Sequence, residues 1–109
     1  PTWLTPQAVS QAQRREILSA GPHWSKLTAR QELGDDTLSG YSAYELTLMR
    51  NEIFAAHGRP FQDPLLRQYF NSRPWYRANP AYEDSLLSDL ERRNAARILS
   101  YQRAHNMNL

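Results

Sequence analysis

Residues 42–58 read SAYELTLMRNEIFAAHG, and this stretch decides the fold that the sequence predicts. Ser42 and Glu45 have the spacing of a capping box, in which the serine accepts a hydrogen bond from the amide three residues later and the glutamate reaches back. Gly58 is a residue that tolerates the left-handed conformation at a helix end. The pattern therefore predicts a helix that begins at Ser42 and runs to His57.

Apolar residues occupy two sides of this predicted helix. At about 100° per residue, Leu46, Met49 and Ile53 form one stripe, and Arg50 and His57 fall beside it. The opposite side carries Tyr44, Leu48, Asn51 and Ala55. A helix that is apolar on two sides is covered by other elements on both. We therefore expect this helix to be central and its polar residues to be partly buried, where they need partners.

Local signals predict further helices on either side of the central one. Thr5-Pro6 and Asp63-Pro64 each place a capping side chain before a proline at the first helical position. A second capping box, Ser88 to Glu91, opens a helix through about His105. The apolar stripe of that helix is Leu87, Leu90, Ile98 and Tyr101, with Asn94 completing the spacing.

The segment before the central helix has a different character. Residues 22–41 show no sustained period, so we expect them to be mostly irregular, with a short helical turn. Their expected anchors in the core are Trp24, Leu27, Leu33 and Leu38. The sequence as a whole predicts a small all-α single domain of about four helices, with a long irregular segment before the central helix.

The signals also predict how the chain is divided. We expect an N-terminal helix or linker over residues 1–21, a helical domain over 22–105 and a tail over 106–109. The chain begins with Pro1 rather than methionine, so we expect it to be a mature or excised piece from which a targeting segment is missing.

Composition narrows the class of protein. The chain has 109 residues, of which 40% are hydrophobic and 22% charged, as is typical of one globular domain. The net charge of +2 is too small to indicate nucleic acid or an acidic membrane surface as a partner. No apolar run approaches the roughly 18 residues of a membrane span, so no membrane insertion is expected. Cysteine is absent, which excludes disulfides and thiolate metal sites.

Motifs that hold metals or cofactors are not found. The histidines at positions 23, 57 and 105 lie on separate predicted elements without ligand spacing. The sequence contains neither a glycine-rich phosphate loop nor a G-x-S-x-G nucleophile elbow. We therefore predict no metal site and no cofactor.

The polar residues of the central helix have three possible roles. For catalysis, Glu52 and His57 are five residues apart, about 140° around the helix, so they cannot act on one atom without help from elsewhere. In a structural role, His57 meets free carbonyls at the helix end, Arg50 and Glu52 brace the loop at 22–41, and Asn51 satisfies the backbone of a neighbouring turn. In the third role, Arg50, His57 or Arg59 contacts a ligand.

A second candidate region is the aromatic and arginine-rich stretch RQYFNSRPWYRANPAY, residues 67–82. Aromatic faces can stack on sugar rings, and arginine pairs with carboxylates or phosphates. In a small domain, however, Phe70 and Trp75 are expected to anchor the core. Arg73, Tyr76 and Arg77 fit a solvent-facing position and a binding face equally well.

The order of these signals resembles the YARHG domain, a bacterial family. The matching motifs are Arg50-Asn51-Glu52-Ile53, Phe54-Ala55-Ala56-His57-Gly58, Tyr69-Phe70, Pro74-Trp75-Tyr76, Asn79-Pro80, Leu86-Leu87 and Glu91-Arg92-Arg93-Asn94. The resemblance covers roughly residues 27 to 102. Two positions depart from the name motif, because phenylalanine replaces tyrosine at 54 and alanine replaces arginine at 56. The resemblance implies a secreted, periplasmic or surface-anchored module, often attached to other domains, with a role in peptidoglycan binding suggested by context.

Three hypotheses follow. The first is a non-enzymatic extracytoplasmic binding module that contacts cell-wall glycan or another envelope or secreted protein. The second is a small hydrolase that uses Glu52 or His57 as general acid or base. The third is an effector, inhibitor or assembly domain that docks on a partner, for which Trp3 and Leu4 are the clue.

Two groups of residues carry the first hypothesis. The predicted ligand contacts are Arg50, Glu52, His57, Arg59, Arg73, Trp75, Tyr76 and Arg77, and no catalytic residue is predicted. The residues predicted to be structural are Ser42, Asn51, Gly58, Phe70 and Ser88.

Overall fold

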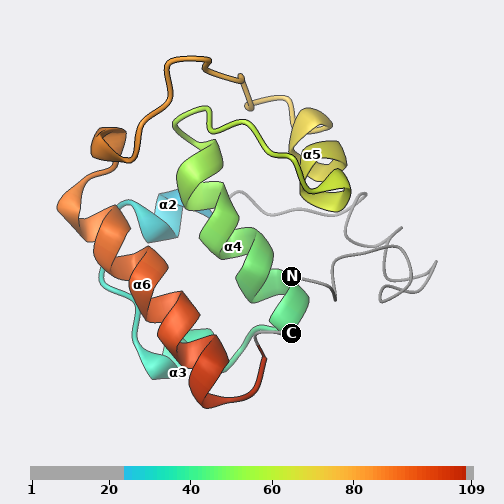
Figure 1. The fold of residues 1–109 in the computed structure, drawn as a ribbon. Helices are drawn as coiled ribbons and strands as arrows, with labels where there is room; N and C mark the ends of the chain where they lie inside the picture. Colours follow the sequence, from blue (N-terminus) through green and yellow to red (C-terminus); the bar gives the residue numbers. More distant parts are fainter. Residues whose placement is uncertain (1–23, 108–109) are drawn as a thin grey trace.

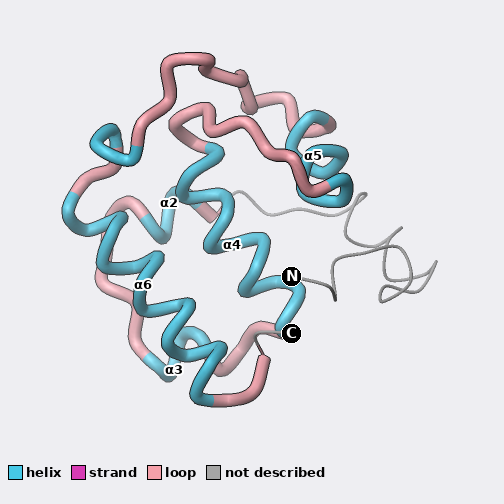
Figure 2. The backbone as a smooth tube through the Cα atoms, in the orientation of Figure 1, coloured by secondary structure: helices cyan, strands magenta, loops and turns pink. Residues whose placement is uncertain are grey.

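The structure, a computed structural model, describes residues 24–107. In chain order its elements are α2 (Ser25–Thr28), α3 (Asp35–Leu38), α4 (Ala43–Ala55), α5 (Pro64–Asn71), the 3-10 helix η2 (Asp84–Leu86) and α6 (Asp89–Ala104) (Figure 1). Every regular element of this described part is helical, as Figure 2 shows, which confirms the predicted all-α class. The helix or linker predicted over 1–21 lies outside the described residues.

Helix α4 is central, as the two-sided pattern predicted. Its capping box is complete, with Ser42 Oγ accepting from the Glu45 amide and Glu45 Oε1 accepting from the Ser42 amide. The helix packs against α6 and α2. Its buried positions are Leu46, Thr47, Leu48, Met49, Glu52, Ile53, Phe54 and Ala55.

The end of α4 lies two residues before the predicted end at His57. The Gly58 amide donates to Ala55 O, and the Arg59 amide donates to Phe54 O, which is the hydrogen-bond pattern of a Schellman motif. Gly58 has φ +89°, so its predicted left-handed role is confirmed. The chain then reverses, and Gly58 O accepts a 2.7 Å hydrogen bond from the Asn79 amide.

Helix α6 lies antiparallel to α4 (Figure 1). Near the end of α6, Gln102 Nε2 donates to Thr47 Oγ1 at 3.0 Å, close to the start of α4. The capping box of Ser88 and Glu91 is formed as predicted. Within the expected stripe, Ile98 and Asn94 are both 0% exposed.

The segment before α4 contains two short helices, α2 and α3, where one helical turn was predicted. Its expected anchors are in place, since Trp24, Leu33 and Leu38 are buried and Leu27 is partly buried against the core. Asp35 and Asp36 lie in the first turn of α3, where acidic side chains favour a helix start. This local signal explains the second short helix.

Asn94 of α6 holds this segment in place. Its Oδ1 accepts from the Leu33 amide at 2.9 Å, and its Nδ2 donates to the carbonyls of Thr28 and Gln31 at 2.7 and 2.9 Å. The three bonds satisfy backbone groups that would otherwise be buried without partners. Asn94 thus joins three backbone groups of this segment to a distant helix, and Arg97 Nε adds a hydrogen bond to the Leu33 carbonyl.

Helix α5 begins as predicted at Asp63-Pro64, because Asp63 Oδ1 accepts from the amides of Leu65 and Leu66. A cluster of aromatic rings then packs the following turn, with Phe61 stacked on Phe70 at a centroid distance of 4.8 Å. Phe70 is 0% exposed, which confirms its expected place in the core. The other rings of the cluster are Tyr69, Trp75 and Tyr76.

Candidate functional site

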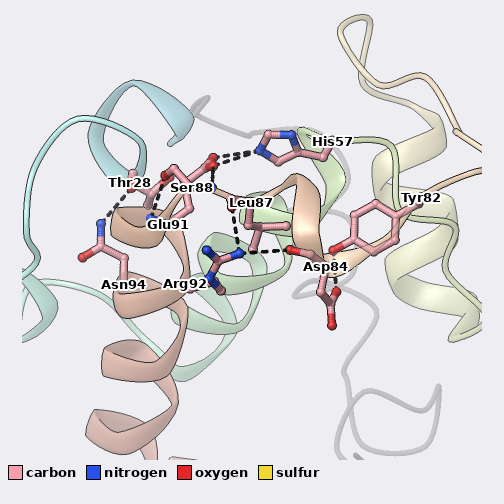
Figure 3. Close-up of polar contacts among 9 residues, drawn as sticks. All are labelled: Thr28, His57, Tyr82, Asp84, Leu87, Ser88, Glu91, Arg92 and Asn94. Carbon is pink, nitrogen blue, oxygen red and sulfur yellow. Dashed lines mark hydrogen bonds and ion pairs between the residues drawn. The ribbon is translucent and has the colours of Figure 1, made fainter.

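His57 lies where the end of α4 meets the start of α6, and it faces Glu91 (Figure 3). His57 Nε2 is 3.0 Å from both carboxylate oxygens of Glu91. A carboxylate only accepts, so Nε2 carries the proton and donates. Glu91 Oε1 also accepts from the Ser88 amide at 2.8 Å. One carboxylate therefore caps α6 and fixes the end of α4.

The surroundings of Glu91 favour its charged form. Burial on its own raises the pKa of Glu91, but hydrogen bonds from the Ser88 backbone and from His57 together outweigh burial and lower the pKa below its usual value. The side chain of Glu91 is 8% exposed, whereas that of His57 is 28% exposed. The pair is thus a partly buried, charge-assisted contact between two helices.

A second set of contacts lies beside this pair and fixes the chain before α6 (Figure 3). Arg92 Nη1 donates to the Leu87 carbonyl at 2.9 Å and to the Asp84 carbonyl at 3.4 Å. Tyr82 Oη donates to Asp84 Oδ1 at 2.8 Å. Burial and then this hydrogen bond raise the pKa of Tyr82 to about 12. These contacts position η2 and the start of α6.

The structure does not pair the two residues of the hydrolase hypothesis with each other. His57 is bound to Glu91, a residue on another helix. Glu52 is 1% exposed and lies within the core. Among the described residues, no group of three or more histidines, cysteines or acids is arranged to hold a metal ion.

Two arginines surround the ring of Phe54, which stands where the YARHG name motif has tyrosine. The guanidinium carbons of Arg50 and Arg59 are 5.3 and 5.0 Å from the ring centroid. Both distances allow a cation–π interaction. Arg59 is exposed and Arg50 is half-buried. The predicted ligand contacts Arg50 and Arg59 are therefore neighbours in space.

The stretch after α5 divides into core and surface. Tyr76 is 8% exposed, and its hydroxyl donates to the Arg59 carbonyl at 2.7 Å. Trp75 is half-buried and packs edge-on against Phe70. Arg77 is exposed, with Nη1 donating to the Pro74 and Tyr76 carbonyls. Tyr76 thus joins Arg59 to the surface that carries Trp75 and Arg77.

Arg73 lies at the edge of this surface. Its guanidinium carbon is 4.5 Å from the centroid of the Tyr69 ring, and Nη2 donates to Ser72 Oγ at 3.2 Å. Tyr69 itself is 0% exposed, and burial raises its pKa. The half-buried arginine thus lies over a buried ring.

Three bracing roles predicted for the central helix are wrong in detail. Asn51 donates to the Thr47 carbonyl of its own helix rather than to a neighbouring turn, because the amide reaches back one helical turn. Arg50 lies over the Phe54 ring, and among the described residues it has no hydrogen bond to the segment before α4. His57 contacts Glu91 instead of carbonyls at the helix end. Asn94 supplies the brace to the segment before α4.

The most important residue missed as a site residue is Glu91. The capping box at Ser88 showed that Glu91 begins a helix, but not that its second oxygen meets His57. The two residues are 34 positions apart, and no local pattern reports such a pair. Arg103 was also missed, although its charge acts on Arg50.

Comparison with known proteins adds a family and a structural neighbour. The YARHG domain matches residues 23–103. Among curated proteins, no relative matches significantly. The crystal structure of a "putative nutrient binding protein" from Legionella pneumophila is similar, with 38% sequence identity and a TM-score of 0.56. The similarity covers 62% of this chain and 22% of that one.

Proposed function

The chain belongs to the YARHG domain family, and we propose that it is a non-enzymatic binding module of an extracytoplasmic bacterial protein. Its proposed ligand is cell-wall glycan or another protein of the envelope. The observation that carries the proposal is the neighbour described as a nutrient binding protein, which is 38% identical over the shared part. Since that part is 22% of the neighbour's chain, its binding function supports a binding role here without defining the ligand.

The proposed contact surface is formed by Arg59, Arg73, Trp75 and Arg77, and we call it the Arg59–Arg77 surface. The Tyr76–Arg59 hydrogen bond of 2.7 Å holds the two ends of this surface together. An indole face and several guanidinium groups suit sugars that carry carboxylates or phosphates. None of the described helices is long and apolar enough to span a membrane, so the proposal does not include insertion by this part of the chain.

The proposal is tested by co-sedimentation with purified peptidoglycan. The wild-type chain is expected to sediment with the glycan, and Arg77→Gln is expected to reduce the bound fraction. Arg67→Gln is a matched control, because Arg67 is an exposed arginine on α5 and is not one of the four residues of the proposed surface. If the chain does not sediment with peptidoglycan but captures a protein of the envelope, glycan is excluded as the ligand. A protein ligand then remains.

The burial of Glu52 is the main argument against the hydrolase hypothesis. A general acid or base has to reach the proton that it transfers, and Glu52 is 1% exposed. His57 already donates to both oxygens of Glu91. We expect no release of soluble fragments when the chain is incubated with peptidoglycan. If the wild-type chain releases soluble fragments and His57→Ala does not, the hydrolase hypothesis is supported.

The docking hypothesis depends on Trp3 and Leu4, which lie outside the described residues. Within the described part, Leu86 is the large hydrophobic residue that is exposed, at 46%. A single exposed leucine is ordinary for a soluble surface and does not indicate a docking face. The described residues therefore favour the Arg59–Arg77 surface over an apolar one.

A further inference from the structure

Two arginines lie over the Phe54 ring, and the charge of a third arginine acts on one of them. Arg50 belongs to α4, Arg59 follows the end of that helix, and Arg103 belongs to the last turn of α6. The first two lie over the Phe54 ring at 5.3 and 5.0 Å. Burial lowers the pKa of Arg50, and the charges of Arg59 and Arg103 lower it further. We call these residues the Arg50–Arg59–Arg103 cluster.

The side chains of the cluster are hydrogen-bond donors only, because a guanidinium group has no acceptor. Arg50 Nε is buried without a hydrogen-bond partner. Leaving a buried donor without a partner is unfavourable, and more so for a charged group. Within residues 24–107, no carboxylate forms an ion pair with any member of the cluster. A group of neighbouring arginines without an acidic partner is most favourable where a bound ligand supplies the negative charge.

The acidic residues of α4 and α6 are committed elsewhere. Glu45 accepts from the Ser42 amide in its capping box. Glu91 accepts from His57 and Ser88. Glu52 is buried in the core at 1% exposure. Among the described residues, neither Glu45 nor Glu91 forms an ion pair with the cluster.

We propose that the Arg50–Arg59–Arg103 cluster binds an oxyanion, a carboxylate or phosphate group of an anionic ligand. Guanidinium groups present planar, paired donors that match both kinds of group. Arg59 and Arg103 are exposed, while the half-buried Arg50 supplies a donor, Nε, that is buried without a hydrogen-bond partner. The Phe54 ring holds two of the guanidinium groups in place. The site rests on the proposed binding function and names the chemistry that it recognises.

The proposal is tested by two-dimensional NMR of the arginine Nε–Hε groups of the full chain. Inorganic phosphate and acetate are titrated separately, at an ionic strength kept constant with sodium chloride. The Arg50 Nε–Hε signal is expected to shift and saturate, because its unpaired donor gains an acceptor. A response to phosphate alone assigns a phosphate-bearing ligand, and a response to acetate as well assigns a carboxylate.

Variants locate the site within the chain. Arg59→Gln and Arg103→Gln each remove one exposed charge, and each is expected to weaken anion binding by about fivefold or more. Arg67→Gln removes the same charge at an exposed position on α5 and is expected to leave binding unchanged. The wild-type titration needs no substitution, so a variant that fails to fold does not prevent the test.

The results that overturn the oxyanion site differ from those that overturn the binding function. If neither anion produces a saturable shift beyond that of sodium chloride, there is no oxyanion site. Equal weakening by Arg67→Gln would mean that only general surface charge is measured, which also overturns it. Retention on peptidoglycan without anion binding would remove the oxyanion site alone, whereas anion binding without retention would remove the glycan proposal alone.

Discussion

The carboxylate of Glu91 contacts the start of α6 and the end of α4 at once. Oε1 completes the capping box with Ser88, and both oxygens accept from His57. The residue therefore stabilises the start of α6 and fixes the end of α4. A polar residue of a family motif thus has a structural role that its position in the sequence alone does not show.

The first prediction concerns the pH dependence of stability. The pKa of Glu91 is lowered in the folded protein, so its contribution to stability is present above the ordinary value of 4.5 and is lost as the pH falls through the folded pKa. Glu91→Gln is expected to reduce this acid-induced loss, measured by urea unfolding from pH 6 down to about pH 3. Glu83→Gln is a control, because Glu83 is exposed. If the loss of stability at low pH is the same in Glu91→Gln as in the wild type, Glu91 does not cause it.

The second prediction concerns Gly58. With φ +89°, an added Cβ would lie 2.6 Å from Asn79 Cβ and 2.7 Å from the Arg77 carbonyl. Gly58→Ala is therefore expected to lower the free energy of unfolding by about 2 kcal/mol or more, since strain and overlap combine. Gly40→Ala is the matched control, because its Cβ would meet only ordinary contact at 3.6 Å. Equal effects of the two substitutions in thermal unfolding would contradict this account.

At the scale of elements, the third prediction separates two asparagines. Asn94 makes three hydrogen bonds to the segment before α4, whereas Asn51 makes one bond within its own helix. Asn94→Ala is expected to cost about 2–4 kcal/mol, and Asn51→Ala about 1 kcal/mol or less. Faster hydrogen exchange at the Leu33 amide, which donates to Asn94, should accompany the first substitution only. Equal exchange in both variants would show that other contacts hold the segment.

Element boundaries were predictable because their signals are local. The capping boxes at Ser42 and Ser88, the Asp63-Pro64 start and the Gly58 end all act within a few residues, and all four are formed. Prediction failed where a partner came from another element. Asn94 was expected only to complete an apolar stripe, yet its bonds to the segment before α4 span more than 60 positions.

At the scale of the whole molecule, the candidate site was only partly predictable. Arg50, Arg59 and His57 were expected to be ligand contacts, and the structure places Arg50 and Arg59 around one ring. The sequence did not indicate Arg103, because the packing of α6 along α4 brings it near. The domain limits of 22 and 105 stay predictions, although the family matches residues 23–103.

The fold also gives residues of the family motif structural contacts. Of its polar residues, His57 joins the end of α4 to α6 through Glu91, whereas Asn51 bonds within α4. The turn at Gly58 joins the end of α4 to Asn79. Cell-wall or protein binding would then depend on arginines at the margin of this junction rather than on its centre.

The central claim is that His57 and Glu91 act as a structural pair that joins α4 to α6. The most direct measurement is a double-mutant cycle on unfolding free energy at pH 7, with His57→Gln, Glu91→Gln and the double variant. We predict a coupling of about 1 kcal/mol or more, because the contact is partly buried and charge-assisted. Additive effects, with coupling near zero, would contradict the claim.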